Sequence, residues 1–421
     1  MKRLTAFLLT FMLAVSAIAQ TKISSSDENL SPAEQSMAQA NRMIAKNPKN
    51  FEAYNALALA LSRRARETSD VKFYAQGEEA LKKSFEVSPG NFDGERILVW
   101  LLLGKHEFAA ARDAARKLNK KMPDDVMVYG FLTDANIELG DYKDAEESAQ
   151  LMLDLRPGNL PGLTRAAYLR ELFGDIDGAV DLMKMALQST PPNQVEDAAW
   201  ILTQVAHLDL AVGKASEAEA QLQRALVLFP GYHYALGNLA KVRILQKRYA
   251  EAIQLLDQRY RAAPHAENLY ELAEALQLAG RSDEAMKAFS EFEQKSLLET
   301  DRADNSNHEL IFYYADYAHE PVQALEVAKR ELARRHDAFT LDAFAWALFV
   351  NGRYREAREQ IEKALAVGLR DTRVMRHAGE IALKAGDQIS AERYLRQAAE
   401  FNTAESEHAR TVLARLSSTQ R

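Results

Sequence analysis

The feature that most constrains this chain is a set of small and turn-forming residues that recur at a nearly constant interval. An alanine recurs with spacings of 34, 39, 34, 33, 39, 33 and 34 residues, at Ala145, Ala179, Ala218, Ala252, Ala285, Ala324, Ala357 and Ala391. A turn glycine precedes most of them, at Gly140, Gly174, Gly213, Gly280, Gly352 and Gly386, and Lys247 and His319 replace it twice. A third column keeps the same register, at Pro123, Pro157, Pro191, Pro230 and Pro264. Because independent columns share one period, the pattern indicates internal repeats rather than an irregular helical bundle.

The unit from Asp124 to Pro157 predicts what each repeat folds into. Its apolar residues fall near helical spacing in two segments, which predicts two amphipathic helices. Gly140 supplies a left-handed residue that ends the first helix, Asp141 can cap the second, and Pro157 ends it. A hairpin this short cannot bury its apolar face alone, so each unit must stack on the next. The recurrent alanine allows the two helices to approach closely.

These residues resemble the tetratricopeptide repeat, a helical hairpin of 34 residues. The signature positions of that family are occupied here by Tyr129, Leu132, Gly140, Tyr142, Ala145 and Pro157. Thr133 stands where a smaller residue is usual. The resemblance covers nearly all of the chain after its first thirty residues, with about ten repeats and two half-units. It implies an all-α fold, a right-handed superhelical solenoid of stacked helix hairpins.

The start of the chain, residues 1–19, has the pattern of a secretory signal peptide. Lys2 and Arg3 form a basic beginning, an apolar run follows, and Ala17-Ile18-Ala19 is a small-x-small cleavage site. We expect cleavage after Ala19 and export to a periplasm or beyond, with no stable membrane insertion of the mature protein.

The remaining chain divides by composition and by register. Residues 20–30 are polar and rich in serine, which predicts a flexible linker. The solenoid is expected over residues 31–421. Its predicted parts are a half-repeat at 31–50, full repeats over 51–402 and a C-terminal capping helix at 405–417. Two longer loops are expected where the register slips, at 192–197 and 299–307.

Composition and motifs indicate no catalytic, cofactor or metal site. The chain has no cysteine, which excludes thiol nucleophiles and thiolate metal sites. Its nine histidines lack the HExxH spacing, and neither GxSxG nor GxGxxG occurs. The net charge of −7, about −9 after signal cleavage, argues against a nucleic-acid partner, because such proteins carry a basic surface. Basic runs at 112–121 and 329–335 are expected on outward-facing helices.

The resemblance implies that the first helices of successive hairpins line a concave groove that holds a partner. By register, the candidate groove residues are Arg165, Tyr168, Gln204, His207, Asn238, Lys241, Glu274, Tyr313 and Trp346. Aromatic rings beside mixed charges suit an extended peptide or protein segment. The alternative for Tyr313 and Trp346 is packing between repeats.

Two classes of function therefore remain open. The first is a non-catalytic exported scaffold that binds a protein or peptide segment in the groove. The alternative is a periplasmic small-ligand-binding protein or enzyme, with a site near the longer loops 192–197 and 299–307. An open groove would favour the first class, and a deep cavity lined with ionisable groups would favour the second.

Overall fold

The structure is a computed structural model of the full chain and describes residues 30–419, apart from 301, 303–304, 306 and 402. The predicted signal peptide and all but the last residue of the predicted linker lie outside the described residues. The described residues form helices joined by turns and loops, without a strand. None of these helices combines the length and the apolar character that a membrane span requires.

Eleven helices of the described chain make the first turn of a superhelix. They are α1 (Pro32–Lys46), α2 (Phe51–Thr68), α3 (Lys72–Val87), α4 (Phe92–Gly104), α5 (Phe108–Lys121), α6 (Val126–Glu138), α7 (Tyr142–Leu155), α8 (Leu160–Leu172), α9 (Ile176–Ser189), α10 (Val195–Ala211) and α11 (Ala215–Leu228). Helix α1 stands alone, and the others pair as antiparallel hairpins, α2 with α3 through α10 with α11.

The second turn continues in the same way. Its helices are α12 (His233–Leu245), α13 (Tyr249–Ala262), α14 (Ala266–Leu278), α15 (Ser282–Leu297), α16 (Asn307–Phe312), the π-helical η1 (Tyr313–Tyr317), α17 (Pro321–Leu332), α18 (Ala338–Val350), α19 (Tyr354–Leu365), α20 (Thr372–Lys384), α21 (Gln388–Ala399) and α22 (Ala404–Thr419). The even-numbered helices up to α14, together with α16, α18 and α20, are called inner helices below, and their hairpin partners are called outer helices. Helix α22 packs on α21 and covers the last hairpin.

The repeated residues have the roles that their spacing predicts. All eight recurrent alanines are fully buried between the helices of their hairpins. The six turn glycines have positive φ, and Lys247 and His319 adopt the same left-handed backbone at φ 58° and 55°. In the hairpin of α6 and α7 the Asp141 N–H donates to the Asn136 carbonyl, at 2.8 Å, which is the six-to-one bond of a glycine-terminated helix.

Three local expectations differ from the structure. The slip at 192–197 lengthens α10 to 17 residues instead of forming a loop there, because Glu196 and Asp197 suit the positive end of a helix. The left-handed residue after α4 is His106, at φ 59°, rather than Gly104. The divergent unit 307–336 contains the π-helical segment η1 in place of one regular inner helix.

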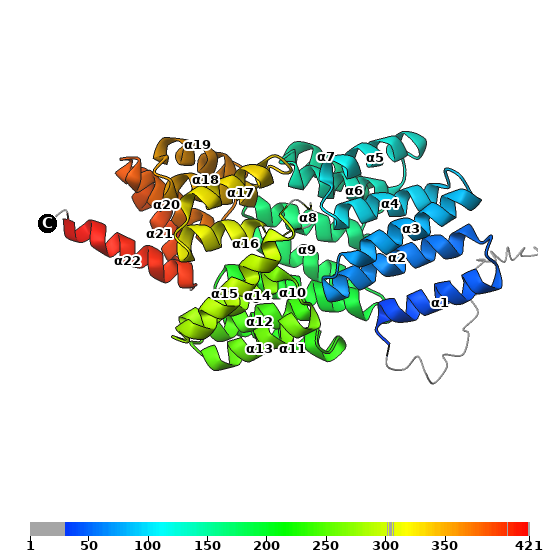
Figure 1. Cartoon of the computed structure of the whole chain (residues 1–421). Helices are drawn as coiled ribbons and strands as arrows, with labels where there is room; N and C mark the ends of the chain where they lie inside the picture. Colours follow the sequence, from blue (N-terminus) through cyan, green and yellow to red (C-terminus); the bar gives the residue numbers. More distant parts are fainter. Residues whose placement is uncertain (1–29, 301, 303–304, 306, 402, 420–421) are drawn as a thin grey trace, which may run out of the picture.

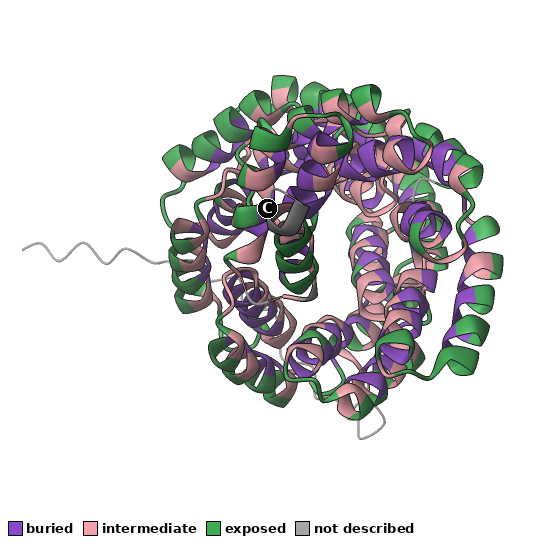
Figure 2. Ribbon diagram, turned by 90° about the vertical axis from the view of Figure 1, so that its left-hand side faces the viewer, coloured by how far each residue is buried: buried purple, intermediate pink, exposed green. Residues whose placement is uncertain are grey.

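The superhelix closes so that its second turn rests on its first. Figure 1 shows the axis running across the page from α1 to α22, and Figure 2 looks along it at a ring of helices. The imidazole Nε2 of His233 lies 2.9 Å from the Arg66 carbonyl oxygen. The His336 N–H donates to the Glu138 carbonyl at 2.9 Å. We call these contacts between turns the seam.

Close backbone approach and a charged pair complete the seam. A Cβ added to Gly174 would lie 2.5 Å from the Gly368 carbonyl oxygen, so the two backbones touch. Arg335 ends the basic run 329–335, and its guanidinium lies 3.2 Å from the Glu138 carboxylate. The expectation of an outward face is therefore wrong for Arg335, which is largely buried because it bridges the two turns.

Candidate functional site

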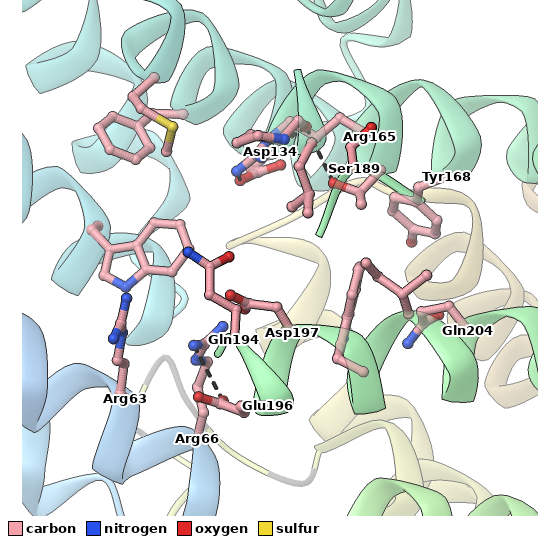
Figure 3. Close-up of a pocket in the computed structure, with 18 of the residues that line it drawn as sticks. Arg63, Arg66, Asp134, Arg165, Tyr168, Ser189, Gln194, Glu196, Asp197 and Gln204 are labelled. Carbon is pink, nitrogen blue, oxygen red and sulfur yellow. Dashed lines mark hydrogen bonds and ion pairs between the residues drawn. The ribbon is translucent and has the colours of Figure 1, made fainter. Parts of the chain in front are cut away.

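The inner face of the first turn encloses a hollow of about 860 Å³. It is lined by all five inner helices of that turn, α2, α4, α6, α8 and α10, so the turn surrounds it (Figure 3). The residues that define the hollow in this article are Arg63, Arg66, Arg96, Trp100, Met127, Phe131, Asp134, Arg165, Tyr168, Glu171, Gln194, Glu196, Asp197, Trp200 and Gln204. Its volume is within the range of pockets that hold a small ligand or a short segment of chain.

Aromatic and aliphatic side chains form part of the wall of the hollow. Trp100 of α4 and Phe131 of α6 pack against each other with ring centroids 6.0 Å apart. Trp200 of α10 and Met127 add further apolar surface. Rings of this kind anchor a bound segment because they bury a large area with few rotatable bonds.

Most charges in the hollow are already paired. Arg165 donates to the Gly130 carbonyl at 3.0 Å and to the Pro161 carbonyl at 3.1 Å, and it reaches the Asp134 carboxylate at 2.5 Å. Arg96 lies 2.8 Å from the Asp125 carboxylate on the next hairpin. These guanidiniums therefore join neighbouring repeats and are occupied by their own chain.

A charged contact closes the ring between its first and last inner helices. Arg66 of α2 lies 3.3 Å from the Glu196 carboxylate of α10, as the dashed line in Figure 3 shows. Arg63 and Asp197 line the hollow beside this pair without an ion pair of their own. Burial raises the pKa of Glu196, and the nearby charge of Arg66 opposes that rise. We call these four residues the latch.

Four neutral polar side chains remain available in the hollow. Tyr168, Gln194, Trp200 and Gln204 all line it, and within the described residues none has a hydrogen-bond partner for its side chain. Burial raises the pKa of the Tyr168 phenol well above its usual value, with the charge of Glu138 adding to the effect. The phenol therefore stays protonated and can donate. Each glutamine amide both donates and accepts, as a peptide group does.

The structure separates the nine predicted groove residues into three groups. Arg165, Tyr168 and Gln204 line the hollow. His207 lies beside it, with its Nε2 2.8 Å from the Glu171 carboxylate that also lines the hollow. Arg165 nevertheless lacks a free donor direction toward a partner, because its three hydrogen bonds hold α8 to α6.

The next group lies on the inner helices of the second turn, apart from the hollow. Asn238 donates to the Tyr234 carbonyl at 3.0 Å, within its own helix. Lys241 lies 3.6 Å from the Glu271 carboxylate. Glu274 accepts a hydrogen bond from the Tyr317 hydroxyl at 3.1 Å.

The last two predicted residues belong to the packing between repeats. Trp346 is only 5% exposed, stacks on His377 with centroids 4.0 Å apart, and donates to Asp316 at 2.8 Å. Tyr313 stacks on Phe289 of an outer helix at 5.4 Å. Their prediction as groove residues is wrong, because large rings at these positions fill the space between hairpins in the second turn.

Sequence reasoning missed several residues of the hollow. Trp100 stands 34 residues before Asp134 in the mid-helix column and could have been found by extending that column toward the start of the chain. Gln194 and Asp197 were assigned to a loop and were therefore left out of the groove. Arg63 carries no repeat signal, and only the closure of the ring brings it to the hollow.

The described residues contain no group of three or more histidine, aspartate and glutamate side chains that could hold a metal ion. The histidines instead lie mostly between packed elements. Burial lowers the pKa of His233 to about 4, so it is neutral where it contacts the Arg66 carbonyl.

Helix hairpins stacked in a superhelix around a hollow define the class of α-solenoid proteins. Family models described as tetratricopeptide repeat match residues 98–159, 209–265 and 343–406. The chain is a tetratricopeptide-repeat protein. No curated protein sequence matches it.

Several solved structures share the fold at low sequence identity. A human IFIT1 dimer with m7Gppp-AAAA is 14% identical, with 87% of this chain and 85% of that chain covered and a TM-score of 0.51. A human IFIT1 dimer with PPP-AAAA is 13% identical, with 88% and 94% covered and a TM-score of 0.50. The type IV pilus biogenesis factor PilW is 15% identical, with 48% and 92% covered and a TM-score of 0.42.

Proposed function

We propose that this protein is a non-catalytic exported scaffold that holds an extended segment of a partner protein in the hollow of its first turn. The observation that carries the proposal is the chemistry of the groups left free there. Tyr168, Gln194, Trp200 and Gln204 are neutral and stand beside an aromatic wall. Such groups pair with the N–H and C=O groups of a peptide and offer little to a strongly charged ligand.

Nucleic acid is the less favoured occupant. The IFIT1 structures contain capped or triphosphorylated oligoadenylate, but their likeness to this chain is in the fold alone. A phosphate backbone needs spare cations. In this hollow Arg66, Arg96 and Arg165 already face carboxylates of the chain. We therefore propose that the protein does not bind nucleic acid.

A small ligand at the same hollow is the second candidate. The segment near 192–197, expected as a place for such a site, supplies Gln194, Glu196 and Asp197 to the lining. The volume of about 860 Å³ also suits a small molecule. Under this candidate, native mass spectrometry of the exported protein would detect a bound mass and no partner chain.

The test is a capture experiment from the exported fraction with the mature chain. The variant Gln194→Glu/Gln204→Glu places two charges in the neutral hollow, and we expect it to lose the partner that the wild type captures. The matched control Gln254→Glu/Gln258→Glu makes the same change at exposed positions of outer helix α13 and should capture normally. Equal capture by both variants would place the binding surface outside the hollow.

Export is part of the proposal and has its own measurement. The pattern of residues 1–19 supports cleavage after Ala19. Mass spectrometry of the exported protein should therefore find a chain that begins at Gln20. Recovery of the intact chain from the cell interior alone would refute export.

A further inference from the structure

The inner face of the first turn is a closed ring rather than an open groove. The hollow is lined by five consecutive inner helices, and the last of them returns to the first. Arg66 of α2 and Glu196 of α10, 130 positions apart in the sequence, are 3.3 Å apart at this junction. A segment lying in the hollow is therefore surrounded by protein on every side around the axis.

The ring is held shut by more than one contact. The Arg66 carbonyl that accompanies the latch also meets His233 at 2.9 Å, so α2 is tied to the start of the second turn. Further along the seam, the Ala338 N–H donates to the Tyr142 hydroxyl at 2.8 Å. Opening the ring sideways would break the latch and separate the stacked turns together.

Since sideways entry needs this disruption, the geometry points to entry along the superhelix axis. We propose that the hollow receives an extended polypeptide end-on, as a strand threaded through the ring, and that it recognises the backbone of that strand. This inference rests on the proposed function and specifies its partner as an unfolded segment with a free end. A folded domain cannot enter a space of about 860 Å³.

The free groups of the hollow indicate tolerance for sequence. Gln194 and Gln204 lie at opposite ends of one stretch of α10, with Trp200 between them. Amides spaced in this way can pair with successive peptide groups of a strand, while the rings contact whichever apolar side chains it carries. The paired charges leave no strong preference for a charged residue.

Two displayed libraries of short random peptides test end-on entry. One is linear with a free amino terminus, and the other is closed into a ring by flanking cysteines. We expect binders from the linear library alone, and each should bind about tenfold more weakly to the Gln204→Glu variant. Ring-closed peptides that depend equally on Gln204 would overturn threading. If neither library yields binders that depend on Gln204, the proposed function fails together with this inference.

A cross-linked latch tests the route directly. The chain has no cysteine, so Arg66→Cys/Glu196→Cys provides two unique thiols for a short bis-maleimide. Linear peptides selected above should bind the cross-linked protein within about twofold of the uncross-linked double variant. Loss of binding on cross-linking alone would show that the ring must open sideways, which would overturn end-on entry while leaving peptide binding intact.

Discussion

Replacing the turn glycine Gly174 by alanine should destabilise the protein far more than the same change at Gly386. Both glycines have the same role after an inner helix, with φ of 79° and 83°. A Cβ at Gly386 meets nothing within 4 Å, whereas one at Gly174 would lie 2.5 Å from the Gly368 carbonyl oxygen of the second turn. The two variants therefore share the backbone strain and differ only in the seam.

The expected magnitudes follow from that comparison. Left-handed backbone costs alanine about 1 kcal/mol, and this is the whole expected loss for Gly386→Ala. Overpacking against a backbone atom adds about 1–3 kcal/mol, so Gly174→Ala should lose about 2–4 kcal/mol. Urea unfolding followed by far-UV circular dichroism measures both losses, and hydrogen exchange at residues 366–371 should rise only in Gly174→Ala. Equal losses for the two variants would refute the stacking of the second turn on the first.

Four further changes test other parts of the structure. Ala252→Phe should cost about 1–3 kcal/mol or more in urea unfolding, because Ala252 is fully buried between helices, while Phe at exposed Ala250 should cost little. Arg165→Met should cost about 1–3 kcal/mol and increase hydrogen exchange in α6, since three hydrogen bonds are lost. The lowered pKa of His233 means that the unfolded chain binds its proton first, so stability should fall as pH drops from about 6.5 toward about 4, and His233→Gln should reduce that fall. Removing residues 404–421 should expose the apolar face of α20 and α21 and raise their hydrogen exchange, because α22 covers it.

Much of the fold could be predicted because its causes are local. The spacing of the alanines and glycines specifies the hairpins, since each hairpin packs mainly on its neighbours. Even where Lys247 and His319 replace glycine, the turn keeps its left-handed backbone, because the flanking helices are specified by their own apolar faces. The extra turn of α10 was missed because the slip of the columns does not reveal whether inserted residues extend a helix or a loop.

The site was harder to predict because its causes are not local. Tyr168 and Gln204 were found because they share a mid-helix face that points inward throughout the first turn. Trp346 was misassigned because the same register position is buried in the second turn, against His377. The latch and the seam depend on the pitch of the superhelix, which sums small rotations over several repeats and leaves no signal at Arg66 or Glu196.

The most direct test of the account is site-specific photocross-linking in living cells. A benzoylphenylalanine at Gln204 reports contact inside the hollow, and the same residue at Gln254 reports contact on the exposed face of α13. The account predicts a discrete cross-linked partner peptide at Gln204 and none at Gln254. Adducts at Gln254 without any at Gln204 would contradict the claim that the hollow holds the partner.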